Sequence, residues 1–343
     1  MLLRRHYIGV TAAVERLVGM QAQEPLAPSV GLWTRLADFD PAELSDLTER
    51  REIVRGTLMR ATVHLTTADD FLLLRPVLQD VMVRRFVASP FARQIEGVPI
   101  EELCAAARAL VEQEPRTTPE LGRALAARWP GVDLDSLGYA ARYILPLVQV
   151  PPRGLWPTRK GAGRAAFTTV DHWVGRPLAD ATVEATLLRY LAAFGPATAA
   201  DFAAWSGLAG VRDVIDGLEL RRLTDDQGRE YVDVPDGLLP DPDTPAPPRF
   251  LPPYDNVLLA HKDRSRVIPD QYRTRVVNDL GCGMLLVDGF VRGTWKVADG
   301  ALSLDLFEPL SGEDVAAVEA EGEKLLAFLT AAPATARPSQ AAS

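Results

Sequence analysis

The hydrophobic pattern is clearest between residues 182 and 235. A helix that Thr182 caps and Gly195–Pro196 ends has apolar residues on one face, namely Leu187, Leu188, Leu191 and Phe194. A second helix follows Thr198, a third covers 211–218, and two strands flank a turn at 225–228. Three helices followed by a hairpin is the order of a winged helix, and a generic three-helix bundle with a hairpin is the alternative.

The same order of elements is predicted between residues 100 and 170. Helices are expected at 100–112, 120–128 and 134–147, followed by strands at 148–150 and 165–169. The N-terminal third shows helical spacing at 14–20 and 30–36, with Pro25 and Pro28 between them, and a β-branched, strand-like run at 62–66. These patterns predict two further winged-helix units before residue 182.

The C-terminal part has a different pattern. Residues 235–253 hold eight prolines in nineteen positions and are predicted to form an extended linker. Strands at 284–287, 290–297 and 301–307, with Asp-Gly turns between them, predict a three-stranded meander. A helix is expected at 313–329, and the last residues are expected to be disordered.

The predicted fold class is mainly α with small β (α+β), with tandem winged-helix units, a C-terminal β-meander and a terminal helix. The predicted divisions are 1–99 for the N-terminal unit with the candidate site, 100–176 for the second unit with a basic wing, 177–236 for the third unit, 237–253 for the linker, 254–330 for the C-terminal β-rich domain and 331–343 for the tail.

The composition narrows the class of protein. The chain has 343 residues, 47% of them hydrophobic, and no run of 18 uninterrupted apolar residues. The first ten residues lack the apolar segment of a signal peptide, so a cytoplasmic protein without a membrane span is expected. The two cysteines and four histidines show no disulfide framework and no metal-ligand spacing. We therefore expect no metal and no cofactor.

Charge is unevenly distributed along the chain. The net charge is −9, but 299–323 alone contributes −8, whereas 142–176 contributes +5. The wing of the second unit concentrates basic side chains, namely Arg153, Arg159, Lys160 and Arg164. The third helix of the third unit exposes Asp213, Asp216 and Glu219, which would repel phosphates. The second unit is therefore the predicted DNA contact and the third unit a scaffold, although any one such run is more often a solvated face.

Two amides at Gln21 and Gln23 stand just before Pro25, and by themselves such residues are usually surface amides. Their surroundings change the interpretation. The runs 19–23 (GMQAQ), 31–35 (GLWTR) and 60–66 (RATVHLT), with 251–256 (LPPYDN), 261–266 (HKDRSR) and 287–295, together resemble the AlkZ/YcaQ-type winged-helix DNA glycosylases. The resemblance covers almost the whole chain. One departure is that only about twenty residues precede the glutamines, where the family often has more.

The resemblance implies tandem winged helices in a C-shape around DNA and the removal of N7-alkylguanine. Some members unhook interstrand crosslinks, and some provide self-resistance to DNA-alkylating natural products. The family's catalytic pair maps onto Gln21 and Gln23; position 23 is Gln as in the AlkZ branch, whereas the YcaQ branch has Asp. The His-apolar-Thr motif adds His64 and Thr66. The expected DNA-binding residues are Trp33, Arg35, Arg60, Arg153, Arg159, Lys160, Arg164, Lys262, Arg264 and Arg266.

Two of these residues have a second interpretation that carries equal or greater weight. His64 orients the water or a phosphate, or it is a buried histidine bonded to the backbone. Trp33 stacks on a base, although a tryptophan at helical spacing more often belongs to the core.

The expected function is a monofunctional, metal-independent DNA glycosylase acting on bulky N7-alkylguanine adducts or crosslinks in double-stranded DNA. The chain has four lysines, none of them in the first 159 residues, so no Schiff-base amine is expected near Gln21. A non-catalytic winged-helix regulator is the alternative; a metal-dependent nuclease is rejected because no suitable carboxylate cluster accompanies the basic patch. We expect a monomer, associated with the nucleoid in the cytoplasm.

Overall fold

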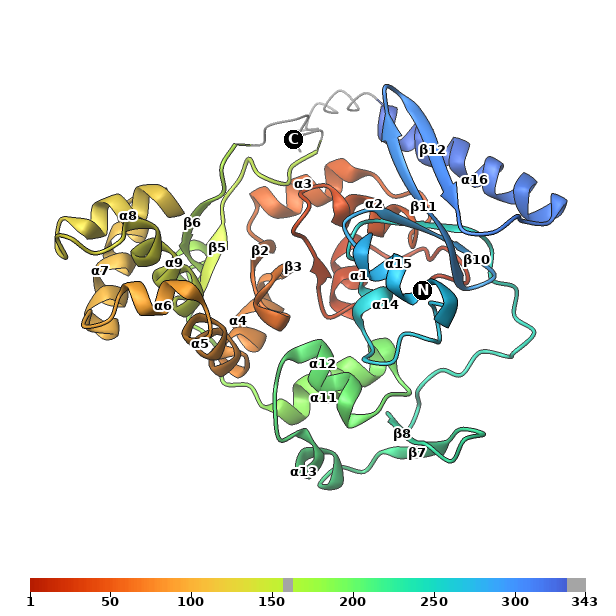
Figure 1. Ribbon diagram of the computed structural model, residues 1–343, viewed down its shortest axis with the longest axis horizontal. Helices are drawn as coiled ribbons and strands as arrows, with labels where there is room; N and C mark the ends of the chain where they lie inside the picture. Colours follow the sequence, from red (N-terminus) through yellow and green to blue (C-terminus); the bar gives the residue numbers. More distant parts are fainter. Residues whose placement is uncertain (157–162, 332–343) are drawn as a thin grey trace, which may run out of the picture.

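The computed structural model describes residues 1–156 and 163–331, and Figure 1 shows the arrangement of its elements. Arg159, Lys160 and nearly all of the predicted tail lie outside the described residues. The sheets are small and antiparallel and helices predominate, so the predicted α+β class is confirmed. No helix in the described part of the chain has both the length and the hydrophobicity that a membrane crossing requires.

The N-terminal unit is built from short helices around three strands. In chain order it contains α1 (Val10–Arg16), β1 (Met20–Gln21), α2 (Ala27–Trp33), α3 (Pro41–Glu49), β2 (Ile53–Thr57), the 3-10 helix η1 (Met59–Ala61), β3 (Val63–Thr67) and α4 (Ala68–Val77). The antiparallel pairing of β1 with β3 places Gln21 opposite His64. Two motifs that are forty residues apart in the sequence therefore meet in one sheet.

The second unit continues that sheet. Its elements are α5 (Gln79–Val87), α6 (Pro90–Gln94), α7 (Ile100–Gln113), β4 (Arg116–Thr117), α8 (Thr118–Ala126), α9 (Leu134–Ile144), β5 (Leu147–Gln149), β6 (Ala166–Thr169) and α10 (Val170–Val174). The strand order is β1-β3-β2-β5-β6-β4, because β2 pairs with β5 across the predicted units. Helices α5 and α6 share a hydrophobic core with α7–α9, although the predicted boundary at residue 99 separates them.

The third unit has the predicted order of three helices and a hairpin. It consists of α11 (Val183–Phe194), α12 (Ala199–Ser206), α13 (Val211–Asp216), β7 (Arg221–Thr224) and β8 (Glu230–Asp233). Thr182 and Thr198 cap α11 and α12 through their side chains, as their positions in the sequence predict. The core of this unit is continuous with that of the N-terminal unit, since Phe202 and Val232 lie in one cluster with Val54 and Phe71.

The C-terminal unit differs from its prediction in one respect. It contains β9 (Arg249–Leu251), α14 (Asn256–Leu259), the 3-10 helix η2 (Asp270–Tyr272), α15 (Arg273–Asn278), β10 (Gly283–Val287), β11 (Phe290–Ala298), β12 (Ala301–Leu306) and α16 (Gly312–Thr330). The predicted three-stranded meander is a four-stranded sheet, because the end of the proline-rich linker pairs as β9 with β10. Prolines flank the three residues of β9 without interrupting them, so the amide groups needed for pairing are present.

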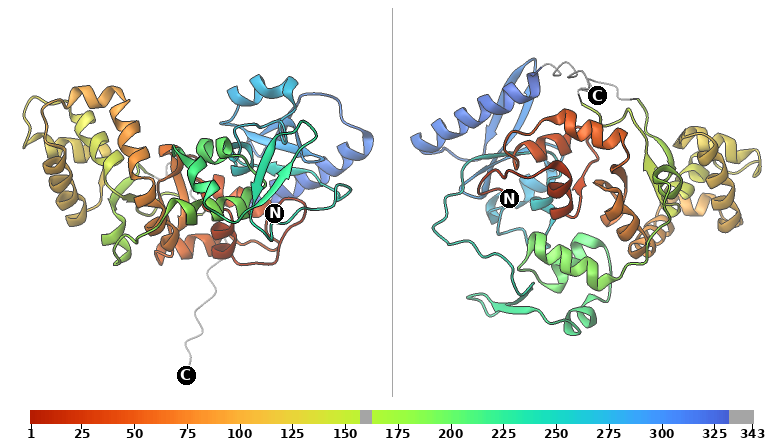
Figure 2. Two further views of the ribbon diagram at one scale, coloured as in Figure 1. Left: turned by 90° about the horizontal axis from the view of Figure 1, so that it is seen from below. Right: turned by 180° about the vertical axis from the view of Figure 1, so that it is seen from behind.

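Seen from below, the second unit and the C-terminal unit form two arms on either side of a base made by the N-terminal and third units (Figure 2). The N-terminal unit also packs directly on the C-terminal sheet and helix, because Val30 and Trp33 share a core with Phe250, Trp295 and Leu325. The short strand β1 therefore lies in the part of the molecule on which the other units converge.

Candidate active site

A chain of hydrogen bonds links the two glutamines to Arg60. The Gln21 amide nitrogen Nε2 donates to Gln23 Oε1 at 2.6 Å, and Arg60 Nη2 donates to Gln21 Oε1 at 2.8 Å. Gln21 is buried, with 6% of its surface exposed, whereas Gln23 is exposed. The buried amide thus connects an arginine to a solvent-accessible amide.

His64 is held as a neutral imidazole beside this chain. Its Nδ1 donates to the Thr62 carbonyl at 2.9 Å, because a carbonyl only accepts, so Nε2 carries a lone pair that faces Arg60 Nη2 at 3.5 Å. Burial, followed by the charge of Arg60, lowers the pKa of His64 to about 3. His64 therefore keeps no positive charge at neutral pH.

Arg60 is fixed from its other side as well. Its Nη1 donates to the Trp205 carbonyl at 2.7 Å, at the end of α12 in the third unit. Its backbone is in the left-handed region, with φ 57° and ψ 15°, which costs a non-glycine residue about 1 kcal/mol or more. Burial and the nearby charge of Arg264 lower the pKa of Arg60 to about 10. In the described residues Arg60 contacts neutral acceptors and no carboxylate.

The backbone that follows Gln21 is held by Arg55 of β2. The Arg55 guanidinium donates to the carbonyls of Ala22 and Pro25, and only 1% of the residue is exposed. A Cβ on Gly154 would lie 2.9 Å from Arg55 Nη1, so the second unit packs directly against this arginine at a glycine with φ +89°. Burial, followed by the charge of Arg153, lowers the pKa of Arg55 to about 10.

The backbone of Gln21 itself is held by the C-terminal unit. Asn256 Oδ1 accepts from the Gln21 backbone N–H at 3.2 Å. Asn256 Nδ2 donates to the carbonyls of Gly19 at 2.6 Å and Leu17 at 3.3 Å. The residue is 91% buried, with 9% exposed, so these bonds are formed away from solvent. Segment 251–256 therefore supports β1, the strand that carries Gln21. In the sequence analysis this segment appeared only as part of the family resemblance.

Arg55 and Asn256 were missed as site residues by the sequence analysis. Arg55 had a usable signal, because a charged residue in the apolar run Ile53-Val54-Arg55 requires buried partners. Asn256 had none of its own, since its partners are more than 230 positions away.

Three of the predicted site residues pack against, or form ion pairs with, other parts of the protein. Arg35 is 2% exposed and forms a bidentate ion pair with Asp255 at 2.7 and 2.8 Å. Trp33 stacks on Phe328 with ring centroids 5.7 Å apart. Thr66 is fully buried, and its methyl group faces Gly19, where a Cβ would lie 2.5 Å away. These side chains are occupied by contacts within the protein.

The other predicted basic residues are distributed over two surfaces. Arg164 is exposed, and Arg153 donates to the Gly163 carbonyl at 3.1 Å, both on the second unit. On the C-terminal unit, Arg266 donates to the Pro196 carbonyl at 2.7 Å, and Lys262 is exposed. Arg264 is half-buried and has no side-chain partner among residues 1–156 and 163–331. Arg159 and Lys160 are not part of the described structure.

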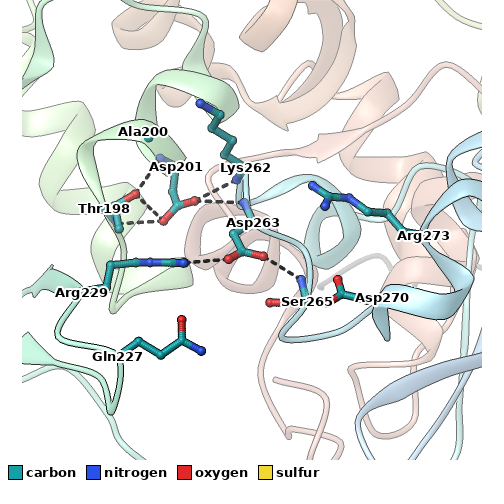
Figure 3. A pocket seen from close by; sticks show the side chains of 10 residues that line it. All are labelled: Thr198, Ala200, Asp201, Gln227, Arg229, Lys262, Asp263, Ser265, Asp270 and Arg273. Carbon is teal, nitrogen blue, oxygen red and sulfur yellow. Dashed lines mark hydrogen bonds and ion pairs between the residues drawn. The ribbon is translucent and has the colours of Figure 1, made fainter.

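A pocket of about 620 Å³ lies between the third unit and residues 262–273 (Figure 3). Arg229 and Asp263 form an ion pair across it at 2.7 Å, while Asp201 accepts from the backbone of Lys262 at 2.9 Å. Three acidic and three basic side chains line the pocket, so their formal charges cancel. This pocket does not include the glutamines, and the hydrogen-bonded site at Gln21 and Gln23 is the stronger candidate.

In the described residues, no group of three or more histidine, cysteine, aspartate and glutamate side chains is placed to hold a metal ion. The hydrogen-bond donors and acceptors at the site are amides, guanidinium groups and one neutral imidazole. These groups can orient a water molecule and stabilise developing charge by hydrogen bonding, and none of them is a strong acid.

An α+β scaffold with basic surfaces and a site of this composition fits the class of DNA glycosylases, and comparison with known proteins places the chain in that class. Residues 14–328 match a family model described as DNA glycosylase AlkZ-like. The chain therefore belongs to the AlkZ-like DNA glycosylase family.

Among solved structures, the DNA glycosylase AlkZ of Streptomyces sahachiroi matches with a TM-score of 0.73 and 21% sequence identity, over 96% of this chain and 92% of that one. At this identity the similarity shows a shared fold. No curated protein sequence matches the chain.

Proposed function

We propose that the chain is a monofunctional, metal-independent DNA glycosylase that hydrolyses the glycosidic bond of N7-alkylguanine in double-stranded DNA. The observation that carries this proposal is the hydrogen-bonded chain Gln23–Gln21–Arg60, in which an exposed amide is backed by a buried one. Such a site has polar groups for water and sugar, and among the described residues no lysine belongs to its hydrogen-bonded chain, so we expect no Schiff base. Membership of a glycosylase family also favours an enzyme over the alternative of a regulator.

The chemistry follows from the charge of the lesion. The bond between C1′ of the sugar and the base nitrogen breaks with its electron pair passing to the purine, which neutralises the positive charge of the alkylated ring. A water oxygen forms the new bond to C1′ and releases one proton to bulk water. Gln23 Oε1 accepts one bond from Gln21 and has a second lone pair, which orients this water and faces the positive sugar.

Neutral His64 contributes by adding no second positive charge beside that of Arg60. A protonated imidazole would oppose the positive charge that develops on the sugar, whereas its low pKa keeps the ring neutral throughout the physiological range. Thr66 supports the same strand through its packing against Gly19.

The DNA contacts that we propose are those predicted basic side chains that form no ion pair within residues 1–156 and 163–331. Arg153 and Arg164 on the second unit, and Lys262, Arg264 and Arg266 on the C-terminal unit, are proposed to bind phosphates. Arg159 and Lys160 remain sequence predictions for the same role. Arg35 and Trp33 are instead assigned to the contact between units.

Bulky N7 adducts and interstrand crosslinks are the proposed substrates, with self-resistance to an alkylating natural product as the biological role in the cytoplasm. The proposed substrates and the proposed role follow from the family resemblance. The protein is proposed to act as a monomer.

The direct test uses a duplex with a single N7-alkylguanine, incubated with excess enzyme. The wild type is expected to release the base and leave an intact strand with an abasic site. Gln21→Ala and Gln23→Ala should each lower the single-turnover rate by about 10²- to 10³-fold, because each removes a group that acts in the transition state. Their Kd for DNA should stay within about threefold of the wild type.

Gln113→Ala is the matched control, since Gln113 is an exposed glutamine at the end of α7, away from the site. It should excise at the wild-type rate, and excess EDTA should change no rate. A wild type that releases no base, or glutamine variants as active as Gln113→Ala, would show that the proposed function or its site is wrong.

A further inference from the structure

We propose that Arg60 is a positioning residue that sets the direction of the hydrogen bonds through Gln21 to Gln23, and so determines which amide group each glutamine presents. This inference rests on the proposed function, because it assigns a task within the same site. It concerns the orientation of the two side-chain amides, which is determined by their hydrogen-bond partners.

The first step is the chemistry of the guanidinium group. Arginine has five N–H donors and no acceptor, so the Gln21 group 2.8 Å from Arg60 Nη2 has to be the carbonyl oxygen. The NH2 group of Gln21 then faces Gln23 at 2.6 Å, and Gln23 has to accept there with its own carbonyl oxygen. A flip of either amide would place two donors or two acceptors against each other.

The second step is the immobility of Arg60. Its Nη1 is bonded to the Trp205 carbonyl at 2.7 Å, and its backbone has the left-handed φ of 57°. The guanidinium is therefore held between the third unit and Gln21. An alternative partner for it within the site is His64 Nε2, and that atom is also an acceptor. Every hydrogen-bond partner that the described structure gives the Arg60 side chain is a neutral acceptor, and Arg264 is a second positive charge nearby.

The third step is polarisation. Because no carboxylate in the described residues pairs with Arg60, its charge acts on the neutral acceptors, above all on Gln21 Oε1. A hydrogen bond accepted by the carbonyl of an amide makes its NH2 a stronger donor. The bond from Gln21 to Gln23 is strengthened in this way, and Gln23 is left with one carbonyl lone pair and two N–H donors for the substrate.

An asymmetry between the two positions follows. The side chain at position 21 has to accept from Arg60 and donate to Gln23, which a carboxylate cannot do. The side chain at position 23 only has to accept from Gln21, and a carboxylate does so equally well. Gln21→Glu should therefore lower the excision rate by about 100-fold or more, whereas Gln23→Glu should retain at least about a tenth of the wild-type rate.

The main test replaces Arg60 and compares it with a matched arginine. Arg84 of α5 donates to the Gly207 carbonyl at 3.1 Å, two residues from the Trp205 carbonyl that Arg60 holds. Arg84→Met thus removes a positive charge and a link to the same end of α12 without touching Gln21. Arg60→Met should lower the single-turnover rate by about 10- to 100-fold with little change in Kd, whereas Arg84→Met should not. Arg60→Lys, which keeps a donor, should recover part of the rate.

A spectroscopic readout separates this role from a loss of folding or of DNA binding. The side-chain NH2 signal of Gln21, identified by its absence in Gln21→Glu, should be shifted by its hydrogen bond in the wild type and in Arg84→Met. It should move to the position of a solvent-exposed glutamine in Arg60→Met.

The outcomes are distinct. An unchanged Gln21 signal in Arg60→Met, a wild-type rate in that variant, or equal losses in Gln21→Glu and Gln23→Glu would each overturn the proposal. If Arg60→Met does not fold, the pair of glutamate variants decides. A wild type without base release would instead refute the proposed function, and the amide signal would still report whether Arg60 orients Gln21.

Discussion

Arg35 and Arg60 both stand in motifs that carry the family resemblance, but their partners in the structure differ in charge. Arg35 is buried with a bidentate carboxylate partner, Asp255, and joins the N-terminal unit to the C-terminal unit. Arg60 is bonded to an amide oxygen and a backbone carbonyl, and it faces a neutral histidine. A guanidinium with a carboxylate is neutralised and serves the fold, whereas one with neutral acceptors keeps its charge for other groups.

Arg55 adds a third case to this comparison. It is as buried as Arg35 but bonds only to backbone carbonyls, at the turn that follows Gln21. The Arg55 guanidinium therefore holds the loop after Gln21 in one conformation. Burial alone therefore does not distinguish a structural arginine from one at the site; the identity of its partners does.

The largest expected effect is on stability, at Arg35. Arg35→Ala leaves the Asp255 carboxylate buried without its partner, and we expect a loss of about 3–5 kcal/mol in the free energy of unfolding, measured by denaturant titration. Arg50→Ala is the control, because the Arg50–Glu52 pair is exposed at 58% and 52% and should contribute little to stability. Equal losses in the two variants would contradict the structural role that we assign to the buried Arg35–Asp255 pair.

The next effect concerns the support of the glutamine strand. Asn256→Ala removes the acceptor of the Gln21 backbone N–H and the donor to Gly19. We expect about a 10- to 100-fold lower excision rate, because small displacements of reacting groups have effects of that size, together with about 1–3 kcal/mol lower stability for each group left unpaired.

Thr66→Val is the control for Asn256→Ala. Thr66 Oγ1 has no hydrogen-bond partner within the described part of the chain, and valine keeps the methyl group that faces Gly19. It should change neither rate nor stability by much. A wild-type rate in Asn256→Ala under folding conditions would show that the C-terminal unit does not position the site.

The smallest effect is a pH dependence from His64. Its pKa is lowered to about 3 in the folded protein, so below pH 6.5 the unfolded chain binds a proton that the folded one does not. Stability should therefore be unaffected by His64 above pH 6.5 and should fall as the pH drops below it, by about 2 kcal/mol at pH 5. Unfolding titrations of wild type and His64→Gln at pH 7 and pH 5 measure this difference. An identical loss in both proteins would mean that His64 is charged in the fold.

The helices and the hairpin of the third unit illustrate how much the local sequence specifies. Thr182 and Thr198 cap their helices, Gly207 with φ +85° ends one, and apolar spacing places Leu187 and Phe202 in the core. Each of these signals acts within a few residues, so it can be recognised without knowledge of the rest of the chain.

The strand β9 shows where local signals end. Arg249-Phe250-Leu251 is extended in either interpretation, but only its pairing with β10 makes it a strand. Its hydrogen-bond partners are more than thirty positions away, so the three-residue segment itself contains no signal that predicts the pairing.

The candidate site combines both situations. The sequence supplies the residue types Gln21, Gln23 and His64, and the resemblance of the surrounding motifs to a known family marks them as candidates for catalysis. The states of these side chains depend on the folded protein: the orientation of the amides depends on Arg60, the neutrality of His64 on its burial, and the position of β1 on Asn256. A pKa value or an amide orientation responds to neighbours and to the exclusion of solvent, which are set by contacts between units and not by the order of residues.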